Sequence, residues 1–181
     1  MRKTIYIIIG LTYFISCQKK QKTEIEKPIS EFDLITDLND FKHKMSELDT
    51  INIWFDHSVC GYEGDENIKI TKQNDSIQIE SKFRDMTFDN SSNWEEMYIL
   101  KLPVNDTIWN FENFLKRNKQ NLISSETSSN PMIISNRNKK IKYYTNRLQG
   151  LLKFQTDFYG VMRKIYPENK YGIYGVEIMT E

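Results

Sequence analysis

Two alternating runs in the middle of the chain constrain its fold more than any other feature. Isoleucines alternate with polar residues over 67–73 and again over 76–83, and an Asn-Asp pair joins the two runs. Alternation is typical of strands with one buried face, and Asn and Asp tolerate the positive φ of a tight type I′ hairpin turn. The sequence therefore predicts an antiparallel hairpin in which Ile70 lies opposite Ile79 and both side chains face a core.

The rest of the chain carries weaker signals of two kinds. Apolar spacing near that of a helix predicts helices, and short apolar runs bounded by Gly, Pro or Asn predict strands. The expected helices cover 31–48 behind a Ser30 cap, the stretch from a cap at Asn105 or Asp106 to Leu122, and 148–165. The other expected strands cover 51–56, 94–102, 132–135, 141–145 and 171–179. Short hairpin links with interspersed helices predict a single α+β domain, with a largely antiparallel sheet of about six or seven strands and three helices.

The N-terminus carries a separate pattern. Arg2 and Lys3 precede an apolar run over 5–16, which is too short to span a bilayer core, since spanning takes roughly 20 helical residues. The run ends in Phe14-Ile15-Ser16-Cys17, and a polar stretch follows. This segment resembles the lipobox of bacterial lipoproteins, with Phe14 in place of the usual Leu.

The lipobox resemblance implies an address for the protein. In lipoproteins the signal is removed, here residues 1–16, and the cysteine, here Cys17, carries acyl chains such as palmitate that hold the protein in a membrane. Residues 17–29 would then form a lipidated N-terminus and flexible tether, and 30–181 the folded domain. Gln18 stands where an Asp would favour the inner membrane, and lysines follow it. The resemblance therefore implies the cell outer membrane, with the domain facing the periplasm.

Charge and cysteine content narrow the classes of function. The chain has 25 basic and 25 acidic residues, and loss of the signal leaves it slightly acidic, whereas a nucleic-acid-binding domain is usually basic. The basic clusters 116–119 and 137–140 are expected to be a helix C-terminus and a hairpin tip rather than binding patches. If Cys17 carries lipid, Cys60 has no partner for an intramolecular disulfide. No phosphate-loop motif is present, and we expect no cofactor.

The densest cluster of reactive side chains follows the first expected strand and comprises His57, Cys60, Glu63 and Asp65. One interpretation pairs Cys60 as nucleophile with His57 as base, which Asp56 would orient if the loop folds sharply. A second is a metal site, although one His and one Cys fall short of the usual zinc pattern. The third, which we favour, makes Cys60 a buried, unpaired, non-catalytic thiol and the acids solvated loop residues. We therefore expect neither a catalytic nor a metal site here.

A second pattern recurs three times as Asp, then a hydroxyl residue, then an aliphatic residue. It resembles the O-glycosylation sequon of exported proteins in some Gram-negative bacteria, and that resemblance would place sugars on Thr50, Ser76 and Thr107. Asp followed by Ser or Thr also favours turns and caps just before strands and helices. The pattern leaves both interpretations open.

Three classes of function fit these features. The first is a non-enzymatic binding or interaction module, held in the envelope by its N-terminal lipid anchor and engaging a protein partner there. The second is an immunity or inhibitor lipoprotein that occupies a toxin or a lytic enzyme. The third is a thiol-dependent hydrolase built on His57 and Cys60. The lack of a recognisable catalytic set favours the first.

Overall fold

The hairpin predicted from the alternating runs is present as strands β2 (Gly64–Gln73) and β3 (Ser76–Asp85). The structure is a computed structural model, and it describes residues 29–88, 92–125, 128–170 and 172–175. Ile70 pairs with Ile79 across the hairpin, as predicted, and neither side chain is exposed. Asn74 takes a positive φ of 52° and Asp75 does not, so the predicted two-residue turn is present but is not of type I′. Burial of each isoleucine contributes about 1.5–3 kcal/mol to stability.

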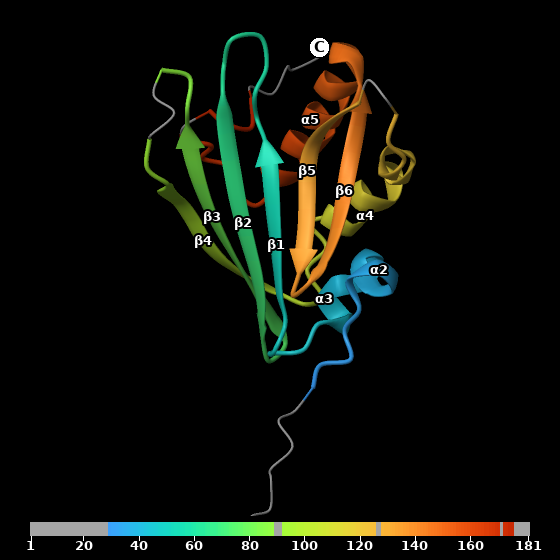
Figure 1. Cartoon of the computed structure of the whole chain (residues 1–181). Coiled ribbons are helices and arrows are strands. Elements are labelled where there is room, and N and C mark those ends of the chain that lie inside the picture. The colour runs from blue at the N-terminus through green and yellow to red at the C-terminus, as the bar shows by residue number, and fades with distance from the viewer. Residues whose placement is uncertain (1–28, 89–91, 126–127, 171, 176–181) are drawn as a thin grey trace, which may run out of the picture.

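The hairpin belongs to a six-stranded antiparallel sheet with the order β4-β3-β2-β1-β5-β6 (Figure 1). The remaining strands are β1 (Thr50–Asp56), β4 (Glu95–Pro103), β5 (Ser128–Asn136) and β6 (Lys139–Asn146). Strands β1 to β4 follow one another as a meander, and a long connection then brings β5 back beside β1. The predicted α+β class with an antiparallel sheet is confirmed.

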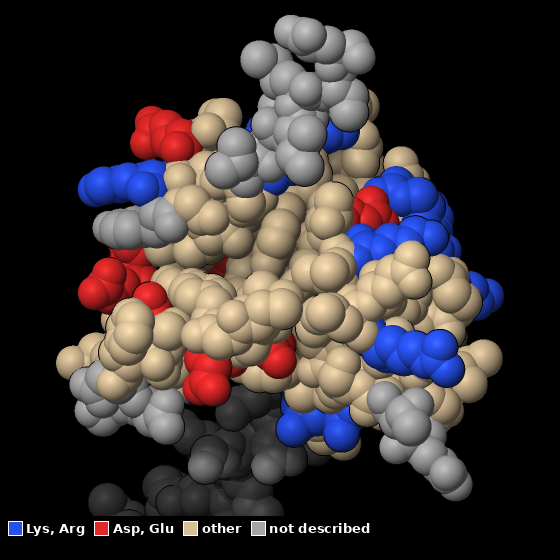
Figure 2. All heavy atoms as spheres, turned by 90° about the horizontal axis from the view of Figure 1, so that it is seen from above, with Lys and Arg blue, Asp and Glu red and all other residues tan. Residues whose placement is uncertain are grey.

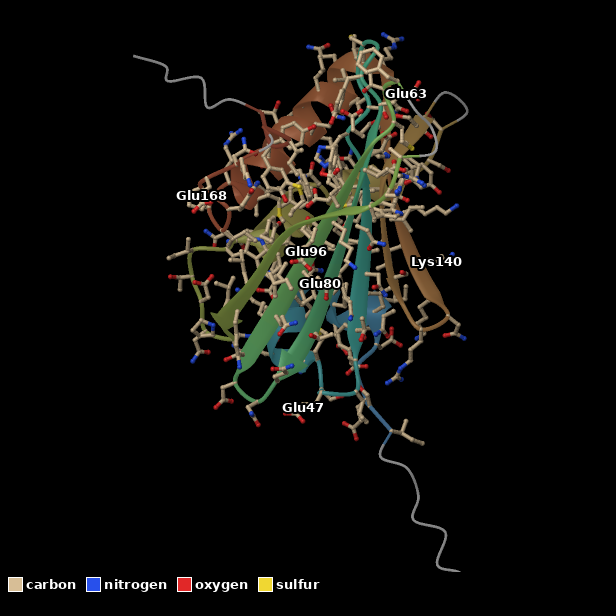
Figure 3. The ribbon with its side chains drawn as sticks, turned by 90° about the vertical axis from the view of Figure 1, so that its left-hand side faces the viewer. Glu47, Glu63, Glu80, Glu96, Lys140 and Glu168 are labelled. Carbon is tan, nitrogen blue, oxygen red and sulfur yellow. The ribbon has the colours of Figure 1, made fainter. Side chains whose placement is uncertain are left out.

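Helices cover one face of this sheet. They are α2 (Leu34–Asp37), α3 (Phe41–Lys44), α4 (Phe111–Arg117) and α5 (Arg147–Met162), with short 3-10 turns at Leu38–Asp40 and Lys119–Leu122. Figure 3 looks along the β4 edge and shows α5 on one side of the sheet, with Lys140 on the other. The core lies between the sheet and α5, where Phe158 stacks on Phe55 with ring centroids 3.7 Å apart.

The first predicted helix, 31–48, is broken into short turns. Ser30 is not its cap, because the first helical turn begins only at Leu34. The Ser30 hydroxyl accepts from the backbone N–H of Phe32 at 3.1 Å and donates to Asp49. Asp33 caps α2 by accepting from the backbone N–H of Ile35 at 2.8 Å, and Asp40 interrupts the helical backbone at φ −145°. The apolar spacing was right for only part of the segment. Ile35 and Leu48 are exposed, and the spaced residues that do enter the core are Phe32, Leu38, Phe41 and Met45. Spacing alone does not require a continuous helix.

Two other expectations are corrected. Four apolar residues assigned to the buried faces of the later helices are exposed, namely Ile108, Leu122, Leu148 and Leu152. The last predicted strand, 171–179, is a turn over its described residues 172–175. Gly172 and Gly175 adopt positive φ there, and the side chain of Tyr174 is fully buried. The other residues of that predicted strand lie outside the described residues.

The predicted export signal and Cys17 also lie outside the described residues, as does nearly all of the tether. Within the described ranges no helix is long and apolar enough to cross a membrane.

Candidate functional site

The four loop residues singled out from the sequence do not converge. His57 points into the core and is 1% exposed, whereas Cys60 and Glu63 are both exposed in the loop between β1 and β2. Asp65 lies on the opposite face of β2, where Arg84 donates to it at 2.7 Å. The described part of the chain holds no group of three metal-ligating side chains.

The expected burial of Cys60 is wrong. The residue is exposed and unpaired, and its backbone takes a positive φ of 46°. Val59 and Tyr62 exchange backbone hydrogen bonds of 2.9 and 3.0 Å around it, which closes a tight turn and puts its two middle residues at the outside. Cys60 therefore lies at a turn tip and not under the sheet edge. No contact joins its thiol to His57.

His57 instead belongs to a buried polar network centred on Glu66, whose side chain is fully buried. His57 Nε2 lies 3.0 Å from one carboxylate oxygen of Glu66. The hydroxyls of Ser81 and Tyr174 each donate to the other oxygen at 2.6 Å. The Tyr98 hydroxyl lies 2.7 Å from that of Tyr174. We call His57, Glu66, Ser81, Tyr98, Tyr159 and Tyr174 the Glu66 network.

Every polar atom of His57 has a partner in this network. Nδ1 lies 3.2 Å from the hydroxyl of Tyr159, and Nε2 faces Glu66. A carboxylate only accepts, so Nε2–H donates to Glu66, and in the neutral imidazole the Tyr159 hydroxyl donates to Nδ1. Neither ring nitrogen remains to activate a nucleophile. The Cys60–His57 pair required by a thiol hydrolase is absent from this geometry.

The pKa values of the network tyrosines are displaced in one direction. Burial raises the pKa of Tyr98 and of Tyr174 well above the ordinary value of 10.0, and the nearby Glu66 charge raises both further. Burial and Glu66 likewise raise the pKa of Tyr159. These phenols stay protonated at neutral pH and serve as donors. A buried carboxylate that accepts from several donors is stabilised without a cation beside it.

Glu66 was missed at the sequence level, although the signal was present. It precedes Ile68 and Ile70 in the same alternating phase of β2, so it must share their buried face. Ser81 stands in the same phase as Ile77 and Ile79 on β3, where it pairs with Ile68 and lies diagonally across from Glu66. A carboxylate in phase with core isoleucines indicates a buried polar site.

A polar row crosses the open face of the sheet at the same end. Asp65, 6% exposed, pairs with Arg84, and the Arg84 guanidinium lies 4.8 Å from the centroid of the Trp94 ring. Stacking on Trp94 and pairing with Asp65 hold this arginine in place. The row stabilises the open face and leaves Asp65 no role as a metal ligand.

An open hollow of about 880 Å³ lies between α4 and α5. We call it the α4–α5 groove. Its lining consists of Arg117, Asn118, Gln120, Lys153, Thr156, Asp157, Gly160, Val161 and Lys164. Asp157 accepts from Arg117 and from Asn118, both at 2.6 Å. This groove, unlike the Glu66 network, presents charged side chains to the outside.

The three Asp-hydroxyl sites are located in turns and at strand starts. Thr50 and Ser76 are the half-buried first residues of β1 and β3, and Thr107 is exposed. Asp106 caps the turn after it by accepting from Trp109 N at 2.8 Å. These positions suit the turn and cap interpretation, and Thr107 is the most accessible hydroxyl of the three.

No protein-family model, curated protein or solved structure matches this chain.

Proposed function

We propose that this protein is a lipid-anchored component of the cell envelope and that its domain is a non-enzymatic binding module. The observation that carries the second half of this proposal is the contrast between its two polar regions. The Glu66 network is buried inside the core. The α4–α5 groove is open, and its two lysines, Lys153 and Lys164, form no ion pair with any described residue. An enzyme needs its reactive groups at an accessible site. A binding module needs an accessible surface whose charged or polar side chains are free to pair with a ligand.

The anchoring half of the proposal follows from the N-terminal sequence. A basic start, an apolar run of signal length and a cysteine at its end favour lipidation of Cys17. Two or more acyl chains make membrane attachment effectively stable. The polar stretch that follows gives the domain reach from the outer membrane into the periplasm.

Mass spectrometry of the mature protein tests the anchor. The expected result is an N-terminus at Cys17 that carries acyl chains, and release of the Cys17→Ser variant from membranes. An unmodified N-terminus at another residue contradicts the anchor.

Thiol labelling tests whether the domain is a thiol enzyme. Because Cys60 is exposed at a turn tip, it should react in the native protein at the rate of an ordinary exposed thiol. That rate should be the same in His57→Gln, because the exposed thiol and the buried imidazole are not in contact. A strongly accelerated reaction that is lost in His57→Gln would make the hydrolase interpretation the better one.

A further inference from the structure

The α4–α5 groove carries an excess of positive charge. The helical segments 111–122 and 147–164 hold seven basic residues and two acidic ones. Figure 2 shows most of the basic side chains on the side of the molecule where β6 and α5 lie, and most of the acidic ones on the side of β3 and β4. The face seen in Figure 2 is therefore electrically polarised, although the formal charges of the chain sum to zero.

Two lysines account for the unsatisfied charge in the groove. The carboxylate of Asp157 is already engaged by Arg117 at 2.6 Å and by Asn118. Lys153 and Lys164 are exposed at the lining and form no ion pair with any described residue. They stand on either side of Asp157 along the chain, so an anionic ligand has two separate cations to bind.

The floor of the groove is apolar and unobstructed. Val161 is buried beneath it, and apart from its chain neighbours and the local helix backbone no heavy atom lies within 4 Å of the position where a Cβ would stand on Gly160. Gly160 and Lys164 also line a second hollow of about 390 Å³, bounded further by Ile108, which is 61% exposed, and Pro167. The two hollows share Gly160 and Lys164, and the second adds the exposed apolar side chain of Ile108 beside them.

The distance between Lys153 and Lys164 limits which anionic partners can contact both lysines. Lys164 lies eleven positions after Lys153, which corresponds to roughly 16 Å of rise along a helix axis. One phosphate or one lipid headgroup is too small to bridge that distance. A membrane-binding patch typically clusters about four to eight basic residues on a convex or flat surface, whereas this is a concave site with two free lysines. An extended polypeptide covers the distance in about five residues.

We propose that the α4–α5 groove binds an extended acidic segment of a partner protein, with carboxylates about five residues apart and an apolar side chain that packs near Ile108. The inference rests on the proposed binding function and names the partner chemistry for it. Lys153 and Lys164 each pair with a carboxylate of the partner. The empty space over Gly160 lets the partner backbone approach the helix closely.

A peptide titration of the folded protein tests the proposal. The probe is a synthetic extended peptide with glutamates about five positions apart around a leucine, and its Gln counterpart is the uncharged control. Binding of the acidic peptide should weaken as salt is added, and amide chemical shifts should move at Lys153, Gly160 and Lys164. The Gln peptide should bind at least about tenfold more weakly.

Charge reversal supplies the matched control. Lys153→Glu with Lys164→Glu should weaken peptide binding at least about tenfold. Lys101→Glu with Lys142→Glu changes the net charge equally, but both residues are exposed on the sheet without an ion pair, so binding should stay nearly unchanged. Equal losses in the two double variants would show that only net charge matters and would overturn the proposal.

Filling the groove tests its shape independently of charge. Gly160→Leu should fold normally, because the added Cβ points into open space, and should block peptide binding. Unchanged binding in this variant would overturn the groove as the site. Tighter binding of vesicles rich in phosphatidylglycerol, or of inorganic phosphate, through the same two lysines would assign the site to those anions instead. Tighter peptide binding after deletion of residues 176–181 would identify the chain's own terminus as the occupant.

Failure of this inference is distinguishable from failure of the proposed function. A full-length protein that retains a partner after Lys153→Glu and Lys164→Glu keeps its binding function but uses another surface. A protein that is not lipidated at Cys17 loses the proposed anchor, whatever the peptide experiment shows.

Discussion

Two polar regions lie on different sides of helix α5, and they differ in whether their polar groups have partners within the domain. Towards the sheet, Tyr159 reaches the Glu66 network, in which buried polar groups find partners within the domain. Away from the sheet, Lys153 and Lys164 line the α4–α5 groove without an ion pair among the described residues. A sealed, satisfied network is retained because breaking it is costly, whereas an open, unsatisfied groove costs the folded state little. Stability and binding are thereby divided between two faces of one helix.

Raising the pH far above 10 should disrupt the Glu66 network completely, and this is the largest effect on stability that we expect. The raised pKa values of Tyr98 and Tyr174 mean that folding favours their protonated forms. Their contribution to stability is therefore fully present below pH 10 and is lost as the pH rises through the folded-state pKa values. Near-ultraviolet absorbance should show these tyrosinates appearing only together with the loss of circular dichroism. Tyrosinate formation in the fully folded protein would contradict the burial of both hydroxyls.

Glu66→Gln should be the most damaging single substitution in the network. It replaces a buried acceptor of several hydrogen bonds by an amide whose nitrogen cannot accept, so at least one buried donor loses its partner. Each such loss costs about 1–3 kcal/mol, and more where the lost acceptor is charged. Urea denaturation measures the loss. Glu80→Gln is the matched control, because Glu80 lies on the open face and forms only long ion pairs of 3.5 and 3.8 Å. That control should lose less than about 1 kcal/mol. Equal losses would show that the network is not what distinguishes the buried side.

Tyr174→Phe should have an intermediate effect. The substitution keeps the ring but removes one hydroxyl, which donates to Glu66 and contacts Tyr98. Removing a buried hydrogen-bonding partner costs about 1–3 kcal/mol, and the variant's stability should also depend less steeply on pH above 10. Tyr144→Phe on the half-buried outer side of β6 serves as the control and should change stability by less than about 0.5 kcal/mol.

Gly160→Ala should change the free energy of unfolding least. It should raise that free energy, whereas the substitutions in the Glu66 network lower it. Glycine inside a helix is less favourable than alanine by about 1 kcal/mol, and the position has open space for a methyl group. The variant should therefore gain a few tenths to about 1 kcal/mol in thermal or urea unfolding. A loss of stability would mean that the groove floor is packed and that Gly160 serves the fold instead of a partner.

The sequence by itself predicted the α+β class and both hairpins. Local chemistry sufficed for these elements: alternating isoleucines required a buried face, and an Asn-Asp pair set the register that places Ile70 opposite Ile79. The second hairpin, β5 and β6, and helix α5 also lie where their patterns predicted them. The order of the strands was not predictable, because the return of β5 to β1 depends on packing between segments distant in the chain.

Only the tertiary structure decided what the candidate site residues do. His57 and Cys60 are three positions apart, yet the turn at φ 46° sends the thiol outward while the strand directs the imidazole into the core. Glu66 accepts a hydrogen bond from Tyr174, which lies 108 positions away in the chain. Lys153 and Lys164 line the same groove as Arg117. Sequence patterns record local periodicity, which fixes the face a side chain occupies. They do not record which distant side chain supplies its hydrogen bond, because that partner is chosen by the packing of the whole domain.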